Sequence, residues 1–232
     1  TPTIYSTPAL PTPTPTYIIL PTATPTDTPP PTPTTELSPT SEPTKKHNGL
    51  IFYDQNDTAW KTKTFPGTNT LFGPSACGYS NVASLISTYT DETIDPYQTM
   101  INYFPNSQGG TVESQVWQVL SDHGFVVTQK NTNLVSLTDT AYPSSARDAI
   151  NSGSVLWLGV VDTNKGIDHQ VLITGFDQKG NLLVSDPERP DAITMDPQGN
   201  QYNAKGDVIY TLPIPKKETA SERISIQLIT PP

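Results

Sequence analysis

The amino-acid sequence predicts an α+β domain, with helices in its first half and a largely antiparallel β-sheet in its second half. Two features predict this class. Between residues 77 and 152 the apolar residues recur at the three- and four-residue spacing of amphipathic helices, and from residue 155 onward they form short continuous runs bounded by turn residues. A run of helices followed by a run of strands is typical of α+β folds, whereas regular alternation would indicate a parallel sheet.

Four helices are predicted. The first, over residues 77–89, follows a Pro-Ser turn in which Ser75 is the expected N-cap. The second begins with Asp95 as its N-cap and Pro96 at its first helical position, where proline is well tolerated. The other two are expected over residues 111–123 and 144–152, and each is followed by a glycine that ends it.

Short apolar runs predict six strands. They are expected over residues 49–55, 155–161, 170–176, 182–185, 208–212 and 224–229. The turn at 177–180 joins two of them into a hairpin. Residues 187–207 are expected to be a loop of the kind that determines specificity.

Residues 1–48 are predicted to be a Thr/Pro-rich linker or stalk, and residues 49–232 a single domain. Thirteen of the chain's 25 prolines lie in the first segment. Proline fixes φ and removes a backbone donor, so this segment is expected to be extended. Such spacers commonly separate an export signal or a surface anchor from a domain. The composition therefore predicts an extracellular or cell-surface protein, with the linker as its tether.

Charge and hydropathy exclude several classes of partner. The net charge is −9 and the sequence has no cluster of Lys and Arg, which argues against nucleic-acid binding. No apolar run is long enough to span a bilayer, so no membrane insertion is expected. With one cysteine the chain forms no internal disulfide. No cofactor is implied, and a monomer is expected.

Cys77 is the only cysteine and lies at the start of a predicted helix. The positive end of the helix dipole favours a thiolate, which is the nucleophilic form of the side chain. The alternative interpretation is that a lone cysteine is a small buried hydrophobic residue.

A cysteine nucleophile needs a base and a group that orients the base. Of the three histidines, His47 lies at the edge of the linker and His123 ends a helix, where a structural role is expected. His169 begins a buried strand. Folding the chain about the turn at 177–180 brings Asp186 within about two positions of His169, inside the reach of a diagonal cross-strand pair. The sequence therefore predicts a carboxylate beside the imidazole.

An oxyanion would need hydrogen-bond donors near the nucleophile. The backbone N–H of Cys77 is available at its helix start. Gln55 lies in a polar turn that leaves the first predicted strand, and its side-chain amide is the candidate for a second donor.

Together these segments resemble the papain-like cysteine peptidases of family thirty-nine, whose best-known members remove bacteriocin leaders at double-glycine sites. The resemblance covers residues 50–190 and includes the segment around Gln55, Cys77-Gly78 opening a helix, the segment around His169 and Ser185-Asp186-Pro187. It implies Cys77 as nucleophile, His169 as base, Asp186 as the orienting residue and Gln55 as the oxyanion donor. The chain departs from the common Gly-Cys-Gly-Pro-Thr motif, with Ala before Cys77 and Tyr-Ser after Gly78, and no transporter domain follows.

The leading prediction is an exported thiol hydrolase that cleaves a peptide or amide bond in a peptide or protein substrate. Three alternatives remain open. The same residues could transfer the acyl group to an amine, or the domain could be a papain-like module that binds peptides or cell wall without catalysis. A calcium loop over residues 162–168 is the third, because oxygen-bearing side chains alternate there.

Overall fold

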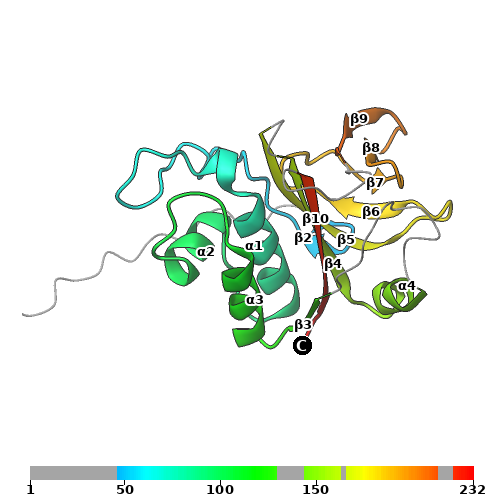
Figure 1. Cartoon of the computed structure of the whole chain (residues 1–232), viewed down its shortest axis with the longest axis horizontal. Coiled ribbons are helices and arrows are strands. Elements are labelled where there is room, and N and C mark those ends of the chain that lie inside the picture. The colour runs from blue at the N-terminus through cyan, green and yellow to red at the C-terminus, as the bar shows by residue number, and fades with distance from the viewer. Residues whose placement is uncertain (1–45, 130–143, 163–165, 214–221) are drawn as a thin grey trace, which may run out of the picture. The chain divides into compact units, whose positions relative to one another are not determined.

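The computed structural model describes residues 46–129, 144–162, 166–213 and 222–232 (Figure 1). Contacts divide the chain into Thr1–Leu37 and Ser38–Pro232. All the described residues belong to the second of these units. The predicted linker over residues 1–48 therefore lies almost entirely outside the described residues.

The described strands form an eight-stranded sheet in the order β3-β10-β4-β5-β6-β7-β8-β9, and every neighbouring pair is antiparallel. The predicted α+β class with a largely antiparallel sheet is confirmed. The strands of this sheet are β3 (Val126–Gln129), β4 (Val155–Asp162), β5 (Ile167–Phe176), β6 (Leu182–Ser185), β7 (Thr194–Met195), β8 (Asn200–Tyr202), β9 (Val208–Thr211) and β10 (Glu222–Thr230). The helices are α1 (Cys77–Tyr89), α2 (Pro96–Tyr103), α3 (Glu113–Asp122) and α4 (Ser144–Asn151).

The helices are divided between the two faces of the sheet, with α1, α2 and α3 on one side and α4 on the other (Figure 1). This division follows from the alternation of side chains along a strand. Trp157 and Leu172 face each other across β4 and β5 and pack into the apolar cluster that contains the first three helices. Their neighbours Leu158 and Val171 are also paired and belong to the second cluster, which includes Ile150 of α4.

The helix starts follow the sequence closely. The first helix spans residues 77–89 as predicted. Asp95 caps α2 by accepting a hydrogen bond of 2.8 Å from the backbone N–H of Gln98, and Pro96 is the first helical residue. The third helix starts at Glu113 rather than at Thr111.

The segment 187–207 is not a simple loop, and that prediction is wrong. It contains β7 and β8, which extend the sheet beyond β6. Strands of two and three residues are too short to produce an alternating apolar pattern, so the sequence gives no sign of them. The Asp196 carboxylate folds the turn between them by accepting hydrogen bonds from the backbone N–H groups of Gln198 and Asn200. Strand β3 was also not predicted, and β5 begins at Ile167 rather than at residue 170.

The folded part extends upstream of residue 49. Strands β1 (Lys46–His47) and β2 (Leu50–Ile51) form a hairpin. Its two turn residues, Asn48 and Gly49, both have positive φ, as a two-residue turn of type I′ requires. The side-chain amide of Asn48 donates hydrogen bonds to the carbonyl oxygens of Val184 and Ile193. The hairpin is thereby attached to the end of β6, immediately before Asp186.

Candidate active site

Cys77 is the first residue of α1 and is half-buried. It follows a short 3₁₀ turn, η1 (Gly73–Ser75), and the N-cap is Ala76, which supplies no capping side chain. The prediction that Ser75 caps the helix is therefore wrong, because Ser75 is already part of the helical turn. With no capping side chain, the N–H groups of the first turn remain available to an anion beside Cys77.

Gly78 allows two other segments to approach the first turn of α1. A Cβ atom at this position would lie 2.1 Å from Oγ1 of Thr111 and 2.7 Å from Oε1 of Gln170. The side chain of Asn81, one turn later, donates a buried hydrogen bond of 2.9 Å to the carbonyl oxygen of Gln170. Gln170 follows His169 in β5, so these contacts fix the start of α1 against the strand that carries the imidazole.

His169 lies in β5 with 6% of its surface exposed, beside both Asp186 and Cys77. Its Nε2 is 2.7 Å from Oδ1 of Asp186, and the side chain of Cys77 lies close enough to contribute to the raised pKa of His169. Since Nε2 is engaged by Asp186, Nδ1 is the nitrogen left to face the thiol. The structure therefore brings Cys77, His169 and Asp186 together.

The charges around His169 favour the imidazolium. Burial lowers the pKa of His169, but the charge of Asp186, the hydrogen bond to it and the interaction with Cys77 outweigh burial and raise that pKa to about 10. Burial also opposes the charge on Asp186, but His169 and the hydrogen bonds from Gln201 and Glu188 lower the pKa of Asp186 from its ordinary value. The imidazolium and the carboxylate stabilise each other as a buried ion pair.

The position of Asp186 follows from the pairing of β5 with β6. Leu172 pairs with Ser185, so continuing this register places Asp186 opposite Val171 and two residues from His169, on the same face. The diagonal relationship predicted from the sequence is the one that the strands form.

Gln201 is a neighbour of the site that the sequence did not indicate. Its Nε2 donates a buried hydrogen bond of 2.7 Å to Oδ2 of Asp186. It lies in β8, within the segment that was predicted to be a loop. A lone glutamine between turn residues carries no signal of such a contact.

Gln55 joins the site through the residue that follows Asp186. Its backbone N–H donates a hydrogen bond of 2.8 Å to the carbonyl oxygen of Pro187. The side chain is 4% exposed, and its Oε1 atom is buried with no hydrogen-bond partner. An unpartnered buried amide oxygen is costly in a folded protein unless a ligand donates to it, so Oε1 is suited to an incoming donor, whereas an oxyanion would have to be bound by Nε2 of the same side chain.

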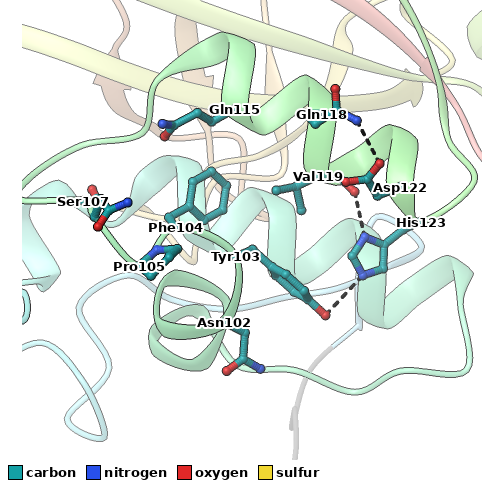
Figure 2. A pocket seen from close by; sticks show the side chains of 11 residues that line it. Asn102, Tyr103, Phe104, Pro105, Ser107, Gln115, Gln118, Val119, Asp122 and His123 are labelled. Atoms are coloured by element: carbon teal, nitrogen blue, oxygen red, sulfur yellow. Dashed lines mark hydrogen bonds between the residues drawn. The ribbon is translucent and has the colours of Figure 1, made fainter. Parts of the chain in front are cut away.

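His123 belongs to a separate region, a cavity of about 460 Å³ between α2 and α3 (Figure 2). Its Nδ1 donates a hydrogen bond of 2.7 Å to the carbonyl oxygen of Val119, and its Nε2 lies 3.2 Å from the hydroxyl of Tyr103. Tyr103 in turn donates to Glu92 at 2.6 Å. His123 thus fixes the end of α3 against α2, in agreement with the structural role predicted for it.

Within the described ranges, no group of three or more His, Cys, Asp or Glu side chains is arranged to hold a metal ion. The calcium loop considered over residues 162–168 includes residues 163–165, which lie outside those ranges, and it stays a prediction. No helix in the described part of the chain is long and apolar enough to cross a membrane.

No protein-family model matches the sequence, and no curated protein matches it. Neither comparison assigns the chain to a family.

Proposed function

We propose that this protein is an exported thiol hydrolase that cleaves a peptide or amide bond, with Cys77 as nucleophile, His169 as general base and acid, and Asp186 as the residue that orients His169. In this proposal the domain has a papain-like fold and is tethered outside the cell or at its surface by the Thr/Pro-rich segment that precedes it. The β1–β2 hairpin (residues 46–51) belongs to the domain, so the tether comprises residues 1–45 rather than 1–48.

The observation that carries the proposal is the position of His169 beside both Asp186 and Cys77. One ring nitrogen is held 2.7 Å from a fully buried carboxylate, and the chain's only cysteine lies close enough to contribute to the raised pKa of the imidazole. A nucleophile, a base within hydrogen-bond reach and a third group that orients the base are the parts that acyl transfer requires. A buried structural cysteine has no need of an imidazole paired with a carboxylate.

The chemistry follows from these contacts. The thiol proton passes to His169 as the sulfur of Cys77 attacks the carbonyl carbon of the substrate. The resulting oxyanion accepts hydrogen bonds from the backbone N–H of Cys77 and the side-chain amide of Gln55. His169 gives its proton to the leaving amine, and the C–N bond breaks to leave a thioester. His169 then takes a proton from water as the water attacks the thioester, and it returns this proton to the departing sulfur, which releases the carboxylic acid and the Cys77 thiol.

Covalent labelling tests the proposal directly. The full chain is treated with a peptidyl electrophile, such as a peptide vinyl sulfone, and intact mass is measured before and after digestion. We expect a single adduct on Cys77 in the folded wild-type protein and none in Cys77→Ala. Incubation with a complex peptide mixture should then produce new termini with the wild type and none with Cys77→Ala.

Two outcomes would overturn the proposal. Labelling of Cys77 only after unfolding would make it a buried structural thiol. Rapid labelling without cleavage or acyl transfer of any peptide would favour the binding module, because the nucleophile would be present without turnover.

A further inference from the structure

The carboxylate of Asp186 is held at both of its oxygen atoms. Oδ1 receives hydrogen bonds from Nε2 of His169 at 2.7 Å and from the backbone N–H of Glu188 at 2.9 Å. Oδ2 receives one from Nε2 of Gln201 at 2.7 Å. The side chains of Asp186 and Gln201 are both 0% exposed, so no water competes for this last bond.

The fold fixes Gln201 from two sides. It lies at the centre of β8, where it is paired with Met195 of β7 and with Tyr210 of β9. The strands β7 and β8 have only two and three residues, and of these Met195 is the one in the buried apolar cluster. Their placement brings the side-chain amide of Gln201 within hydrogen-bond distance of the Asp186 carboxylate, which also binds His169.

We propose that Gln201 is a positioning residue for the triad, which holds Asp186 ionised and turned so that Oδ1 faces His169. A carboxylate held only at Oδ1 can rotate about its terminal bond, and a second donor at Oδ2 removes that freedom. The hydrogen bond also stabilises the negative charge that keeps His169 protonated. This inference rests on the proposed function for its effect on catalysis, but its effect on His169 can be measured without it.

No neighbouring group substitutes for Gln201. The guanidinium of Arg189 lies 3.8 Å from Oδ2, beyond hydrogen-bond distance, and it is engaged 2.5 Å from Glu188 and 3.3 Å from the centre of the Tyr210 ring. The carboxylate of Glu188 lies 3.9 Å from Nδ1 of His169 and is 40% exposed. With Cys77 and Tyr210, these are the titratable and charged groups that face the pair among the described residues, and within that part of the chain Gln201 is the one side chain that donates to Oδ2 at short range.

The test compares Gln201→Met, which keeps the shape and removes the donor, with Gln227→Met as a matched control. Gln227 is also a buried glutamine in the same sheet, 3% exposed, and its Oε1 has no hydrogen-bond partner. Two quantities are measured in the full chain: the titration of His169 by NMR of its ring nitrogens, and the pH dependence of Cys77 alkylation by iodoacetamide.

In Gln201→Met we expect His169 to lose its proton at lower pH than in the wild type. Alkylation at pH 6 and kcat should both fall by about 10- to 100-fold, the effect of one hydrogen bond to a charged group, while KM changes little. Gln227→Met should leave the titration, the alkylation and kcat unchanged. If His169 lost its proton at the same pH in Gln201→Met as in the wild type, the proposal would be overturned.

Gln201→Glu gives a second test that does not depend on the behaviour of the Met variant. The introduced carboxyl would share one proton with Asp186. At low pH it should donate to Oδ2 and preserve near-wild-type alkylation, and as pH rises that proton should be lost, together with the ordered triad. If the alkylation rate of Gln201→Glu showed no such additional loss as pH rises, the role of Gln201 would be overturned. If wild-type protein cleaved nothing and Cys77 were inert, the proposed function would fail, while the titration of His169 would still decide the role of Gln201.

Discussion

The backbone N–H of Gln55 donates a hydrogen bond of 2.8 Å to the carbonyl oxygen of Pro187, the residue that follows Asp186. One short bond therefore connects the candidate oxyanion donor to the candidate orienting residue. The two are far apart in the sequence and come from a turn before α1 and from the end of β6. Because the bond uses the main chain of Gln55, its side-chain amide is left for a different partner.

This arrangement predicts that Gln55→Ala lowers kcat by about 10²- to 10³-fold with little change in the free energy of unfolding. Alanine retains the backbone N–H that binds Pro187, so only the side-chain donor is lost. Steady-state kinetics and urea denaturation on the same preparation would measure both quantities. Gln178→Ala, in the exposed turn at the opposite end of the β5–β6 hairpin, is the control. A loss of stability with normal activity in the folded fraction would make Gln55 a structural residue.

A second prediction concerns the packing at Gly78. A methyl group there would lie 2.1 Å from Thr111 Oγ1, so Gly78→Ala should destabilise the domain by about 1–3 kcal/mol. The double substitution Gly78→Ala with Thr111→Ala removes the colliding atoms and should recover part of that loss, because the remaining contact is the movable end of Gln170. Gly109→Ala is the control, since a Cβ atom at Gly109 would meet nothing within 4 Å. If the two single substitutions changed the free energy of unfolding by amounts that simply added up in the double variant, the predicted collision would be contradicted.

The sequence predicts the parts of the site that depend on local structure or on the number of residues that separate two positions from a hairpin turn. Asp95 and Pro96 mark a helix start by their own chemistry, and the distance from His169 to Asp186 follows from the position of one hairpin turn. Ser75 was assigned wrongly because the chain enters a 3₁₀ turn before α1, and nothing local distinguishes that turn from a cap. Gln201 could not be found at all, because its contact depends on two very short strands placed by tertiary packing.

The pKa of His169 predicts how stability depends on pH. Its ordinary value is 6.5, and in the folded protein the ion pair with Asp186 raises it to about 10. While Asp186 stays ionised, the stabilisation from this pair is fully present below about pH 6.5 and is lost as pH rises through about 10, because between these values the folded state holds a proton that the unfolded state has released. The free energy of unfolding should therefore fall over this range.

Urea denaturation at intervals from pH 6 to pH 10 measures this slope. His169→Gln keeps a donor toward Asp186 but cannot be protonated, so its slope should be shallower than that of the wild type. Equal slopes for the two proteins would show that His169 is not held as an imidazolium in the folded state.

The hydrogen bonds of Asp186 make Asp186→Asn an informative substitution. The asparagine oxygen can accept from Nε2 of His169, and its NH₂ group then faces Gln201. Oε1 of Gln201 has no hydrogen-bond partner, so the Gln201 amide can turn over and accept that bond without losing another. The network should therefore stay satisfied and the domain should fold, with the negative charge removed.

Asp186→Asn is therefore expected to lower kcat by about 10²- to 10⁴-fold, because the imidazolium of His169 loses the charge that stabilises it. Alkylation of Cys77 at pH 6 should slow in parallel, since the imidazolium that lies beside Cys77 loses the carboxylate that stabilises it. Asp196→Asn is the control, because Asp196 also accepts several hydrogen bonds but does not contact His169. Kinetics, alkylation and circular dichroism on both variants separate loss of charge from loss of fold. Wild-type kcat in Asp186→Asn would remove Asp186 from the mechanism.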